Sequence, residues 1–302
     1  MQKDVVIIGS GPAGLSAGIY AVRAGFDALI IERTGMGGGQ VLNTYEVDNY
    51  PGMPGINGFD LGTKMYEHVK QLGVEVMACD VHGVECEEEW KVIHTSQGEI
   101  QTKTLVIATG ATHAKLNVKG ENEFGGKGVS YCATCDGAFF RNRKVAVVGG
   151  GDVAVEDAIF LAGMCEKVYL IHRRDELRAA KSLQEKLMAR DNVEIVWNTV
   201  VNCIEGKDKV ENLKLQNKND GQIKDLAVSG VFVAVGMKPE TEVFQGVVEM
   251  DAHGYIQADE YCETSQPGIV VAGDARTKRL RQIVTAVADG ANAIYSLEKY
   301  LR

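Results

Sequence analysis

One local pattern occurs twice in this chain, and it restricts the fold more than any other feature of the sequence. A short apolar run is followed by closely spaced glycines and a helix-like pattern, first in "DVVIIGSGPAGLSAGIYAVRAG" and again in "KVAVVGGGDVAVEDAIFLAG". The second copy begins 140 residues after the first (149 − 9). A strand that turns over glycines into a helix starts a Rossmann-type unit, whose helix N-terminus binds a dinucleotide pyrophosphate. The repeat therefore predicts two such α/β units.

In the first copy, Gly9, Gly11 and Gly14 fit the spacing G-x-G-x-x-G. The first glycine permits a tight turn, the second lets a pyrophosphate approach the backbone, and the third allows close packing of helix on strand. A second apolar strand, "ALIIE", ends in Glu32, eighteen residues after Gly14. A carboxylate there would accept hydrogen bonds from a ribose. We expect this unit to bind an adenine dinucleotide that has no 2′-phosphate.

In the second copy, Gly149, Gly151 and Ala154 take the places of the three glycines. The position that matches Glu32 is His172 (32 + 140), at the end of the strand "KVYLIH". A carboxylate would repel a phosphate at this place, whereas guanidinium groups donate charged hydrogen bonds to one. The expected dinucleotide of the second unit is therefore NADPH. The arginines that would bind its 2′-phosphate lie in "HRRDELR": Arg173, Arg174 and Arg178.

The remaining apolar strands indicate how the chain is divided. "LVIATG" and "VFVAVG" end in similar turns, and "GIVVAGDA" precedes a long helical pattern from about residue 281 to 300 that we expect to return to the first unit. The predicted fold is α/β, with two Rossmann-like, FAD/NAD(P)-binding three-layer domains, the second inserted in the first. The expected bounds are 1–114 and 238–302 for the FAD-binding domain and 115–237 for the NADPH-binding domain.

Among the seven cysteines, only Cys132 and Cys135 in "SYCATCDGAFF" have C-x-x-C spacing. A zinc site would need two more ligands, usually a second close pair, which the sequence lacks, so no metal is expected. Asp136 follows directly and is the nearest acid, although it could also be a turn residue before Gly137. The scattered cysteines are expected to be small buried apolar residues: Cys79, Cys86, Cys165, Cys203 and Cys262.

Composition excludes several other classes of protein. Of 302 residues, 45% are apolar and 24% charged, which is typical of a soluble globular protein. The formal charge of −9 argues against nucleic acid or an anionic membrane as a partner. No apolar run reaches the roughly 18 residues of a membrane span, and the N-terminus leads into a strand rather than a signal peptide. We expect a cytoplasmic protein, a setting in which structural disulfides are rare.

The motifs together carry a resemblance that covers essentially the whole chain. "GSGPAG", "GGQ", "EVDNYPG", "ATGA", "CATCDG", "GGGDVAVEDA", "HRRDELRA" and "AGDA" followed by "RQI" stand in the order found in the low-molecular-weight thioredoxin reductases of bacteria, which are flavin disulfide reductases. The resemblance implies a homodimer that binds FAD in the first domain and NADPH in the second. It also implies thioredoxin or a thioredoxin-like protein as the partner. One departure is "GMGGGQ", where the family often has a longer, charged loop near the flavin.

The resemblance also implies which residues form the site. Cys132 and Cys135 match the redox pair, and Asp136 matches the proposed proton donor. The positions in the first domain that match FAD contacts are Gly9, Gly11, Pro12, Ala13, Gly14, Glu32, Gly39, Gln40, Asn49, Gly110, Gly273, Asp274, Arg281, Gln282 and Ile283. The NADPH positions are Gly149, Gly151, Asp152, Ala154, His172, Arg173, Arg174 and Arg178. Taken alone, Asp274 could equally be a helix cap.

The expected route of electrons is NADPH, FAD, the disulfide and then an external disulfide. Cys135 is expected to face the flavin and Cys132 to attack the substrate disulfide. Three other functions remain open from the sequence. They are a flavin NADPH oxidase, a ferredoxin-dependent reductase such as those of some clostridia, and a redox-sensing module that reports NADPH. Because both the second glycine motif and the arginines are present, NADPH is favoured over ferredoxin as the donor.

Overall fold

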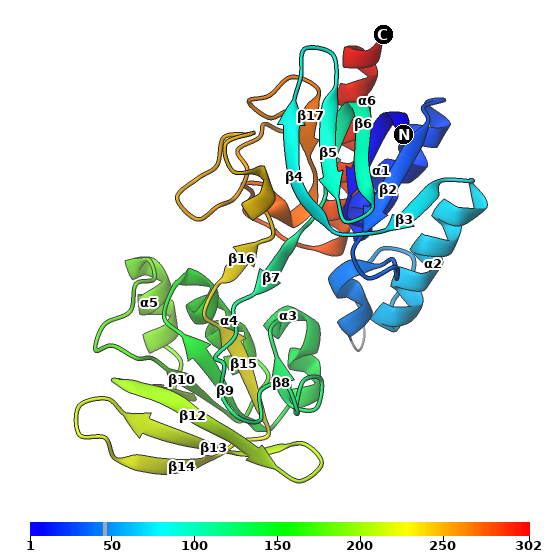
Figure 1. The fold of residues 1–302 in the computed structure, drawn as a ribbon. Coiled ribbons are helices and arrows are strands. Elements are labelled where there is room, and N and C mark those ends of the chain that lie inside the picture. Colours follow the sequence, from blue (N-terminus) through cyan, green and yellow to red (C-terminus); the bar gives the residue numbers. More distant parts are fainter. Residues whose placement is uncertain (45–46) are drawn as a thin grey trace. The chain divides into compact units, whose positions relative to one another are not determined.

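The computed structural model describes residues 1–44 and 47–302, and it divides into two compact units (Figure 1). The first unit is Met1–Thr112 with Lys238–Arg302, and the second is His113–Met237. The chain thus leaves the first unit once and returns to it once. The crossing segments are themselves strands that pair with one another, β7 (Ala111–His113) and β16 (Met237–Pro239).

The first unit is built on a seven-stranded sheet in the order β3-β2-β1-β6-β5-β4, with β17 also paired to β6. Strands β3, β2, β1, β6 and β17 are parallel, and β4 and β5 run antiparallel. The strands are β1 Gln2–Ile8, β2 Ala28–Glu32, β3 Glu75–Ala78, β4 Val81–Cys86, β5 Lys91–Thr95, β6 Gly98–Ile107 and β17 Ile269–Val271.

Side chains of β1 alternate between two cores, as expected for a strand buried on both faces. Val5 and Ile7 pack in the core shared with the helices. Val6 and Ile8 pack in the opposite core, which also holds Phe244. The unit therefore has three layers, with helices on one face of the parallel sheet.

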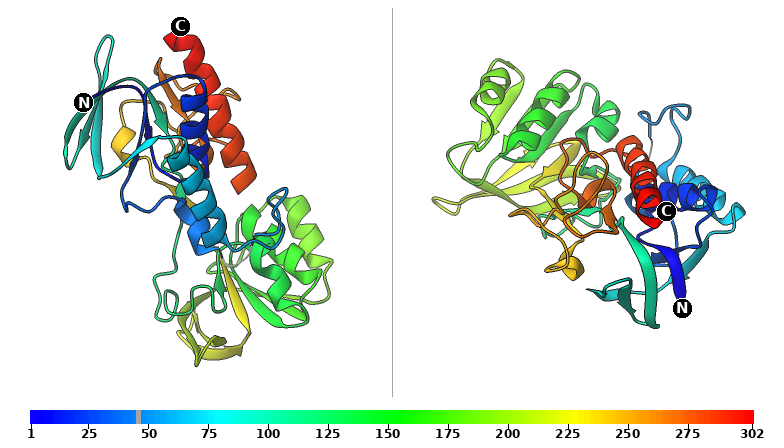
Figure 2. Two further views of the ribbon diagram at one scale, coloured as in Figure 1. Left: turned by 90° about the vertical axis from the view of Figure 1, so that its right-hand side faces the viewer. Right: turned by 90° about the horizontal axis from the view of Figure 1, so that it is seen from above.

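Helices α1 and α6 lie side by side in this unit (Figure 2). Their contact is close because Gly290 of α6 faces α1, where a Cβ would overlap the carbonyl oxygen of Ala13. The helices of the unit are α1 Pro12–Arg23, α2 Gly58–Gln71 and α6 Ile283–Leu301, with short 3-10 turns η1 Gly39–Asn43, η3 Glu242–Phe244 and η4 Gly273–Ala275.

The second unit repeats this plan on a five-stranded parallel sheet in the order β11-β10-β9-β15-β8. Val145 and Val147 of β9 face the core with the helices, and Ala146 and Val148 face the antiparallel sheet β12-β13-β14. Its elements are β8 Val129–Ser130, α3 Ala133–Asp136, η2 Gly137–Phe140, β9 Lys144–Gly149, α4 Asp152–Ala162, β10 Lys167–Ile171, α5 Lys181–Met188, β11 Val193–Val196, β12 Thr199–Gly206, β13 Val210–Asn217, β14 Ile223–Ala227 and β15 Gly230–Ala234.

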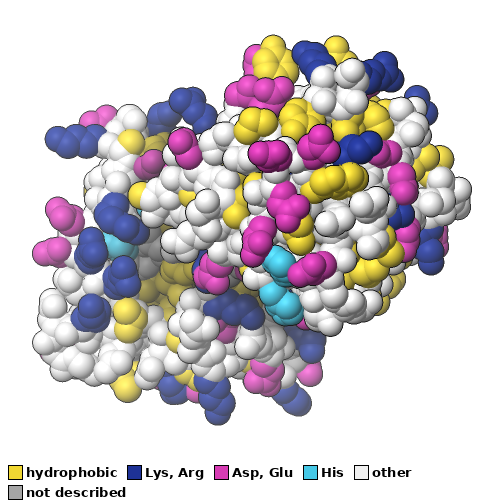
Figure 3. Space-filling view, turned by 45° about the horizontal axis from the view of Figure 1, so that its top comes forward, with side chains coloured by type: hydrophobic (Ala, Val, Ile, Leu, Met, Phe, Trp, Pro, Cys, Tyr) yellow, Lys and Arg dark blue, Asp and Glu magenta, His cyan; other side chains and the backbone are white. Residues whose placement is uncertain are grey.

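The expected fold class is confirmed, since both units are three-layer α/β structures of the Rossmann type and the second is inserted in the first. Within the described residues, no helix is both long and apolar enough to cross a membrane. On the face drawn in Figure 3, acidic and basic side chains are both spread over the surface. The expectation that the five scattered cysteines are buried holds for Cys79, Cys165 and Cys262 but is wrong for Cys86, which is exposed at the end of the edge strand β4, and Cys203 is only partly buried.

Candidate active site

The C-x-x-C pair forms a disulfide at the start of the short helix α3 in the second unit. Cys132 is the N-cap residue of that helix, and its Sγ accepts the backbone N–H of Cys135 at 3.2 Å. A hydrogen bond of this kind favours the thiolate form of a cysteine. Both cysteines are partly exposed. The pair therefore has the two properties of an exchangeable disulfide, access from solvent and a local donor for the sulfur anion.

Asp136 lies against this pair at the C-terminal end of α3. Its carboxylate accepts a 2.6 Å hydrogen bond from the hydroxyl of Ser130, and the same hydroxyl accepts the backbone N–H of Cys132 at 3.1 Å. Burial raises the pKa of Asp136 above its ordinary value, and the hydrogen bond from Ser130 opposes part of that rise. A carboxyl that holds its proton at higher pH beside a disulfide suits proton exchange with a thiolate.

The segment before the pair is fixed by a buried carboxylate that sequence reasoning missed. Glu121 is buried and accepts hydrogen bonds from the backbone N–H groups of Leu116 and Asn117 at 2.9 and 2.7 Å, and from the hydroxyl of Tyr131 at 2.9 Å. The ring of His113 stacks on Tyr131 with centroids 5.2 Å apart. The residue next to Cys132 is thus tied to the segment by which the chain enters the second unit.

The first glycine loop has the geometry of an anion site. Gly9 has φ 106°, and a Cβ on Gly14 would overlap the carbonyl oxygen of Gly9, so both positions require glycine. Gly11 is the N-cap of α1 with open space around it and no side-chain cap, and Pro12 follows at the first helical position. The free N–H groups of this helix end are available to a phosphate.

Glu32, at the end of β2, is held over this loop. Its Oε2 accepts both the backbone N–H and the hydroxyl of Ser10, at 3.0 and 2.5 Å, while Oε1 accepts the backbone N–H of Thr34 at 3.1 Å. A carboxylate oxygen accepts more than one hydrogen bond, so Glu32 keeps capacity for the hydroxyls of a ligand.

Segments far apart in sequence converge on the same loop. A Cβ on Gly273 would lie 2.9 Å from the Cβ of Ala13, and one on Gly39 would lie 2.9 Å from the Cα of Gly11. The side-chain amide of Asn49 donates to the Oε1 of Gln282 at 2.9 Å, and that of Gln40 donates to the carbonyl of Ala111. The remaining expected positions are Gly110, with φ 72°, and Ile283, which begins α6 and packs beside Val41.

Two buried polar atoms beside this loop find no hydrogen-bond partner among the described residues, Oδ1 of Asp274 and Nε of Arg281. Burial raises the pKa of Asp274, while Lys278 and Arg281 act to lower it. The Arg281 guanidinium carbon lies 4.1 Å from the centre of the Tyr255 ring. Because buried polar groups are nearly always paired, these two atoms fit a ligand that donates a hydrogen bond to Asp274 and accepts one from Arg281.

Asp289, a residue of α6 that the sequence did not reveal, stabilises the turn Gly273–Ala275. It accepts the backbone N–H of Gly273 at 3.0 Å and forms ion pairs with Arg276 and Lys278 at 2.9 and 2.8 Å. Burial alone would raise the pKa of Asp289, but hydrogen bonds from these two cations outweigh it and lower that pKa. The buried carboxylate thereby connects α6 to the turn that carries Asp274.

The second glycine loop differs from the first in detail. Gly149 does not have a positive φ, and glycine is needed there because a Cβ would overlap the carbonyl oxygen of Ala234. Gly151 again caps its helix with open space around it. The Asp152 carboxylate already accepts a hydrogen bond of 2.8 Å from the backbone N–H of Ala180, so only part of its capacity is left for a ligand.

His172 is buried beneath this loop, where its ring would overlap any Cβ on Gly150. Burial lowers the pKa of His172, so the ring is neutral near pH 7. Its neighbour in the motif, Arg178, donates its backbone N–H to the carbonyl of Gly150 at 2.7 Å. The side chains of Arg173, Arg174 and Arg178 are exposed, and none has an ion-pair partner in the described part of the chain.

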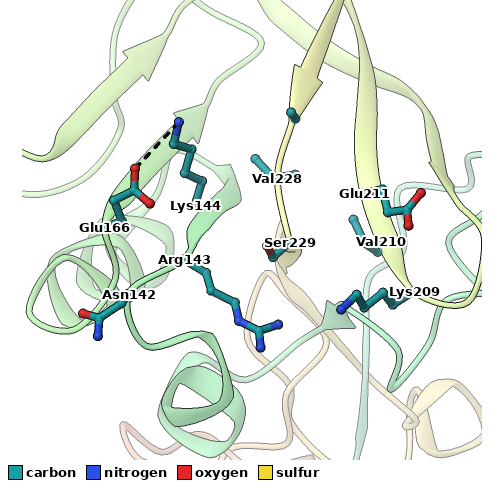
Figure 4. A pocket seen from close by; sticks show the side chains of 10 residues that line it. Asn142, Arg143, Lys144, Glu166, Lys209, Val210, Glu211, Val228 and Ser229 are labelled. Carbon is teal, nitrogen blue, oxygen red and sulfur yellow. Dashed lines mark ion pairs between the residues drawn. The ribbon is translucent and has the colours of Figure 1, made fainter.

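A separate cavity of the second unit, of about 410 Å³, contains none of these residues (Figure 4). It lies between the start of β9, the start of β13 and the segment that follows β14, and Lys144 and Glu166 form an ion pair of 3.7 Å at its edge. Arg143 and Lys209 also line it. It belongs to the side of the unit where the strands of the sheet begin, whereas the glycine loop follows the end of β9.

These features match a known family over nearly the whole chain. The profile of the family "Pyridine nucleotide-disulphide oxidoreductase" matches residues 3–290. The chain belongs to this family. It is 46% identical to a thioredoxin reductase of Listeria innocua over 299 residues, 99% of this chain and 93% of that one, and 44% identical to a thioredoxin reductase of Bacillus subtilis with 99% and 94% covered. A solved thioredoxin reductase from Streptococcus pyogenes superposes with a TM-score of 0.94 at 46% identity, covering 99% of this chain and 98% of that one.

Proposed function

We propose that the protein is a thioredoxin-disulfide reductase that takes electrons from NADPH through FAD and the Cys132–Cys135 disulfide. One observation carries the proposal: the same chain holds two dinucleotide loops of different charge and an exchangeable disulfide beside a partly buried carboxyl group. The names of the relatives support thioredoxin as the substrate. We expect the enzyme to act as a homodimer in the cytoplasm, where protein thiols are kept reduced.

The residues of the first unit fit FAD. The open helix end at Gly11 suits its pyrophosphate, Glu32 suits a ribose, and the unpaired atoms of Asp274 and Arg281 suit hydroxyl and phosphate oxygens. We therefore assign FAD binding to 1–114 and 238–302. In the second unit, the open helix end at Gly151 and the unpaired arginines suit the pyrophosphate and the 2′-phosphate of NADPH. We assign NADPH binding to 115–237.

When bound, the two cofactors would supply the pair of electrons that reduces the disulfide. The chain's own residues then manage the sulfur chemistry. Reduction breaks the Cys132–Cys135 bond and leaves two thiolates, of which one takes the proton of Asp136. The Cys132 thiolate, favoured by the Cys135 N–H, attacks the substrate disulfide and forms a mixed disulfide. Cys135 then returns its proton to the Asp136 carboxylate and attacks Cys132, which re-forms the internal disulfide. The two substrate sulfurs leave as thiolates and take their protons from solvent.

NADPH consumption by the FAD-loaded protein tests this function. We expect fast consumption with oxidised thioredoxin and slow consumption with oxygen alone. Cys132→Ser and Cys135→Ser should each lower the rate of thioredoxin reduction by at least about 1,000-fold, because no exchangeable disulfide remains. Both variants should still bind the flavin. Cys203→Ser, which changes a partly exposed cysteine outside the pair, is the matched control. Equal consumption with and without thioredoxin would indicate an oxidase instead.

The ferredoxin-dependent alternative receives less support. A reductase that takes electrons from ferredoxin has no use for arginines that stand unpaired beside a glycine loop. A wild-type enzyme that reduced thioredoxin with reduced ferredoxin but ignored NADPH would restore this alternative.

A further inference from the structure

Ser130 occupies a position from which one hydroxyl group contacts both the acid and the redox pair. It ends the strand β8, whose backbone pairs with β15 so that Ser130 stands opposite the fully buried Phe232. The residue is 5% exposed. Its Oγ donates to the Asp136 carboxylate at 2.6 Å, accepts the Cys132 N–H at 3.1 Å and lies 3.3 Å from the Cys132 carbonyl oxygen. Strand β8 thus places the hydroxyl against both the Asp136 carboxylate and the main chain of Cys132.

Among the residues that the structure describes, none forms an ion pair with Asp136, and the pKa of this acid is shifted by burial and by the hydrogen bond from Ser130. Helix α4, which packs on α3, carries three acids and no basic residue: Asp152, Glu156 and Asp157. The turn η2 has no titratable residue, and the hydroxyl of Tyr131 is bound to Glu121. In the part of the chain that the structure describes, Ser130 is the side chain that donates to the Asp136 carboxylate. The ionised form of this acid therefore depends on one neutral donor.

We propose that Ser130 is a positioning residue for catalysis: it holds Asp136 at the redox pair and sets the pH range in which Asp136 delivers its proton. This inference rests on the proposed function, since it takes Asp136 as the acid. The hydroxyl stabilises the carboxylate that remains after the proton has moved to a cysteine thiolate. By accepting the Cys132 N–H, it also keeps the first cysteine at a fixed place relative to that carboxylate.

The direction of the effect follows from the hydrogen bond. Turnover needs Asp136 protonated, so the rate falls as pH rises through its pKa. Ser130→Ala removes a donor to the ionised form, which raises the pKa and moves the alkaline limb of the kcat profile to higher pH. A hydrogen bond to a charged group corresponds to a shift of about 1 to 2 pH units. The looser carboxyl should also lower kcat at the optimum by about 3- to 10-fold.

The experiment compares kcat–pH profiles for thioredoxin reduction by FAD-loaded wild type, Ser130→Ala, Ser130→Thr and Asp136→Asn. Ser130→Thr keeps the hydroxyl and should restore the wild-type limb, and Asp136→Asn should lose the limb altogether. Ser296→Ala is the matched control, because Ser296 is a buried serine that donates to the Tyr261 carbonyl in the other unit. Rates are expressed per bound flavin, and reduction of ferricyanide, which accepts electrons directly, verifies an intact holoenzyme.

Two outcomes would overturn the proposal. One is a Ser130→Ala enzyme whose rate drops equally at every pH, which is the behaviour of a purely structural residue. The other is an alkaline limb that moves to lower pH. If Ser130→Ala does not fold, Ser130→Cys, with its weak donor, must show a smaller shift to higher pH, and an unshifted limb overturns the proposal. Thiol titration after NADPH addition measures reduction of the pair itself, so the test stands even if thioredoxin proves not to be the substrate.

Discussion

The two glycine loops match position by position at an offset of 140 residues, yet the residues beneath them are of opposite kinds. In the first unit, Ser10 donates its hydroxyl to Glu32. At the matching positions of the second unit, Gly150 leaves room for the buried ring of His172. The first loop packs on the hydrogen bond from Ser10 to Glu32, which keeps a carboxylate beside the proposed nucleotide site. The second loop packs on the neutral ring of His172, and the charged groups near it are the exposed side chains of Arg173 and Arg174.

The difference shows that one backbone plan serves two nucleotides by exchange of paired residues. Neither member of a pair can change alone, since a serine at Gly150 would overlap His172 and a glycine at Ser10 would remove the hydroxyl that donates to Glu32. The helices that follow diverge as well. Ala17 is fully buried in α1, and the matching position in α4 is the acid Asp157 (17 + 140).

The strongest test of this comparison exchanges the third position of each motif. Gly14→Ala places a methyl group on the carbonyl oxygen of Gly9, and we expect a cost of about 3 kcal/mol or more and loss of FAD. Ala154→Gly makes the reverse change in the second unit, where the methyl group is buried without overlap, and should cost only about 1–2 kcal/mol. Urea unfolding and flavin absorbance measure both. Similar costs for the two variants would mean that the loops are not built differently here.

The second test concerns the charge that replaces Glu32. Arg173→Gln with Arg174→Gln should raise the KM for NADPH by about 100-fold, because two charge-assisted contacts to a phosphate are lost. The KM for NADH should hardly change. Arg190→Gln, an exposed arginine of the same unit, is the matched control. Wild-type enzyme that used both nucleotides equally well would rule out a phosphate site at these arginines.

Much of the fold was accessible from the sequence, because the strand–glycine–helix repeat depends on local patterns. The apolar runs, the positive φ of Gly9 and the return of the C-terminal helix are all encoded within short segments, and the fold class is confirmed. The pairing of β7 with β16 could not be foreseen. Both segments are short, and each becomes a strand only because the other lies beside it.

The residues that hold the site residues in place could not be predicted from the sequence either. Ser130, Glu121 and Asp289 act through side-chain directions and approaches between segments, which no spacing rule describes. Asp289 is 13 residues from the cation Arg276 with which it pairs, and its burial could not be read from a helix with otherwise ordinary patterning. Gly150 could have been noticed as the middle of three consecutive glycines, but the reason for it, the ring of His172, is visible only in three dimensions.

A third test addresses the pair beneath the second loop. Gly150→Ala should force the ring of His172 against the loop and raise the KM for NADPH by about 5- to 30-fold, the equivalent of about 1–2 kcal/mol. His172→Ala added to this variant should recover part of the loss. Gly151→Ala should also weaken NADPH binding, because it crowds the pyrophosphate, but His172→Ala should not rescue it. Strictly additive effects of Gly150→Ala and His172→Ala would show that the two residues are not coupled.

The last test concerns the two helices, and the expected effect depends on pH. Burial, together with the charge of Glu156, raises the pKa of Asp157 to about 7. The folded protein therefore holds this proton more tightly than the unfolded chain, and the protein loses stability as pH rises from about 4 to 7. Asp157→Asn removes the charge and should stabilise the second unit by about 1–2 kcal/mol more at pH 8 than at pH 5, as measured by urea unfolding.

The exposed Asp208→Asn removes the same charge elsewhere in the unit and should show no such difference between the two pH values. A gain of Asp157→Asn that is equal at pH 5 and pH 8 would mean that the acid in α4 is as well accommodated as Ala17 is in α1.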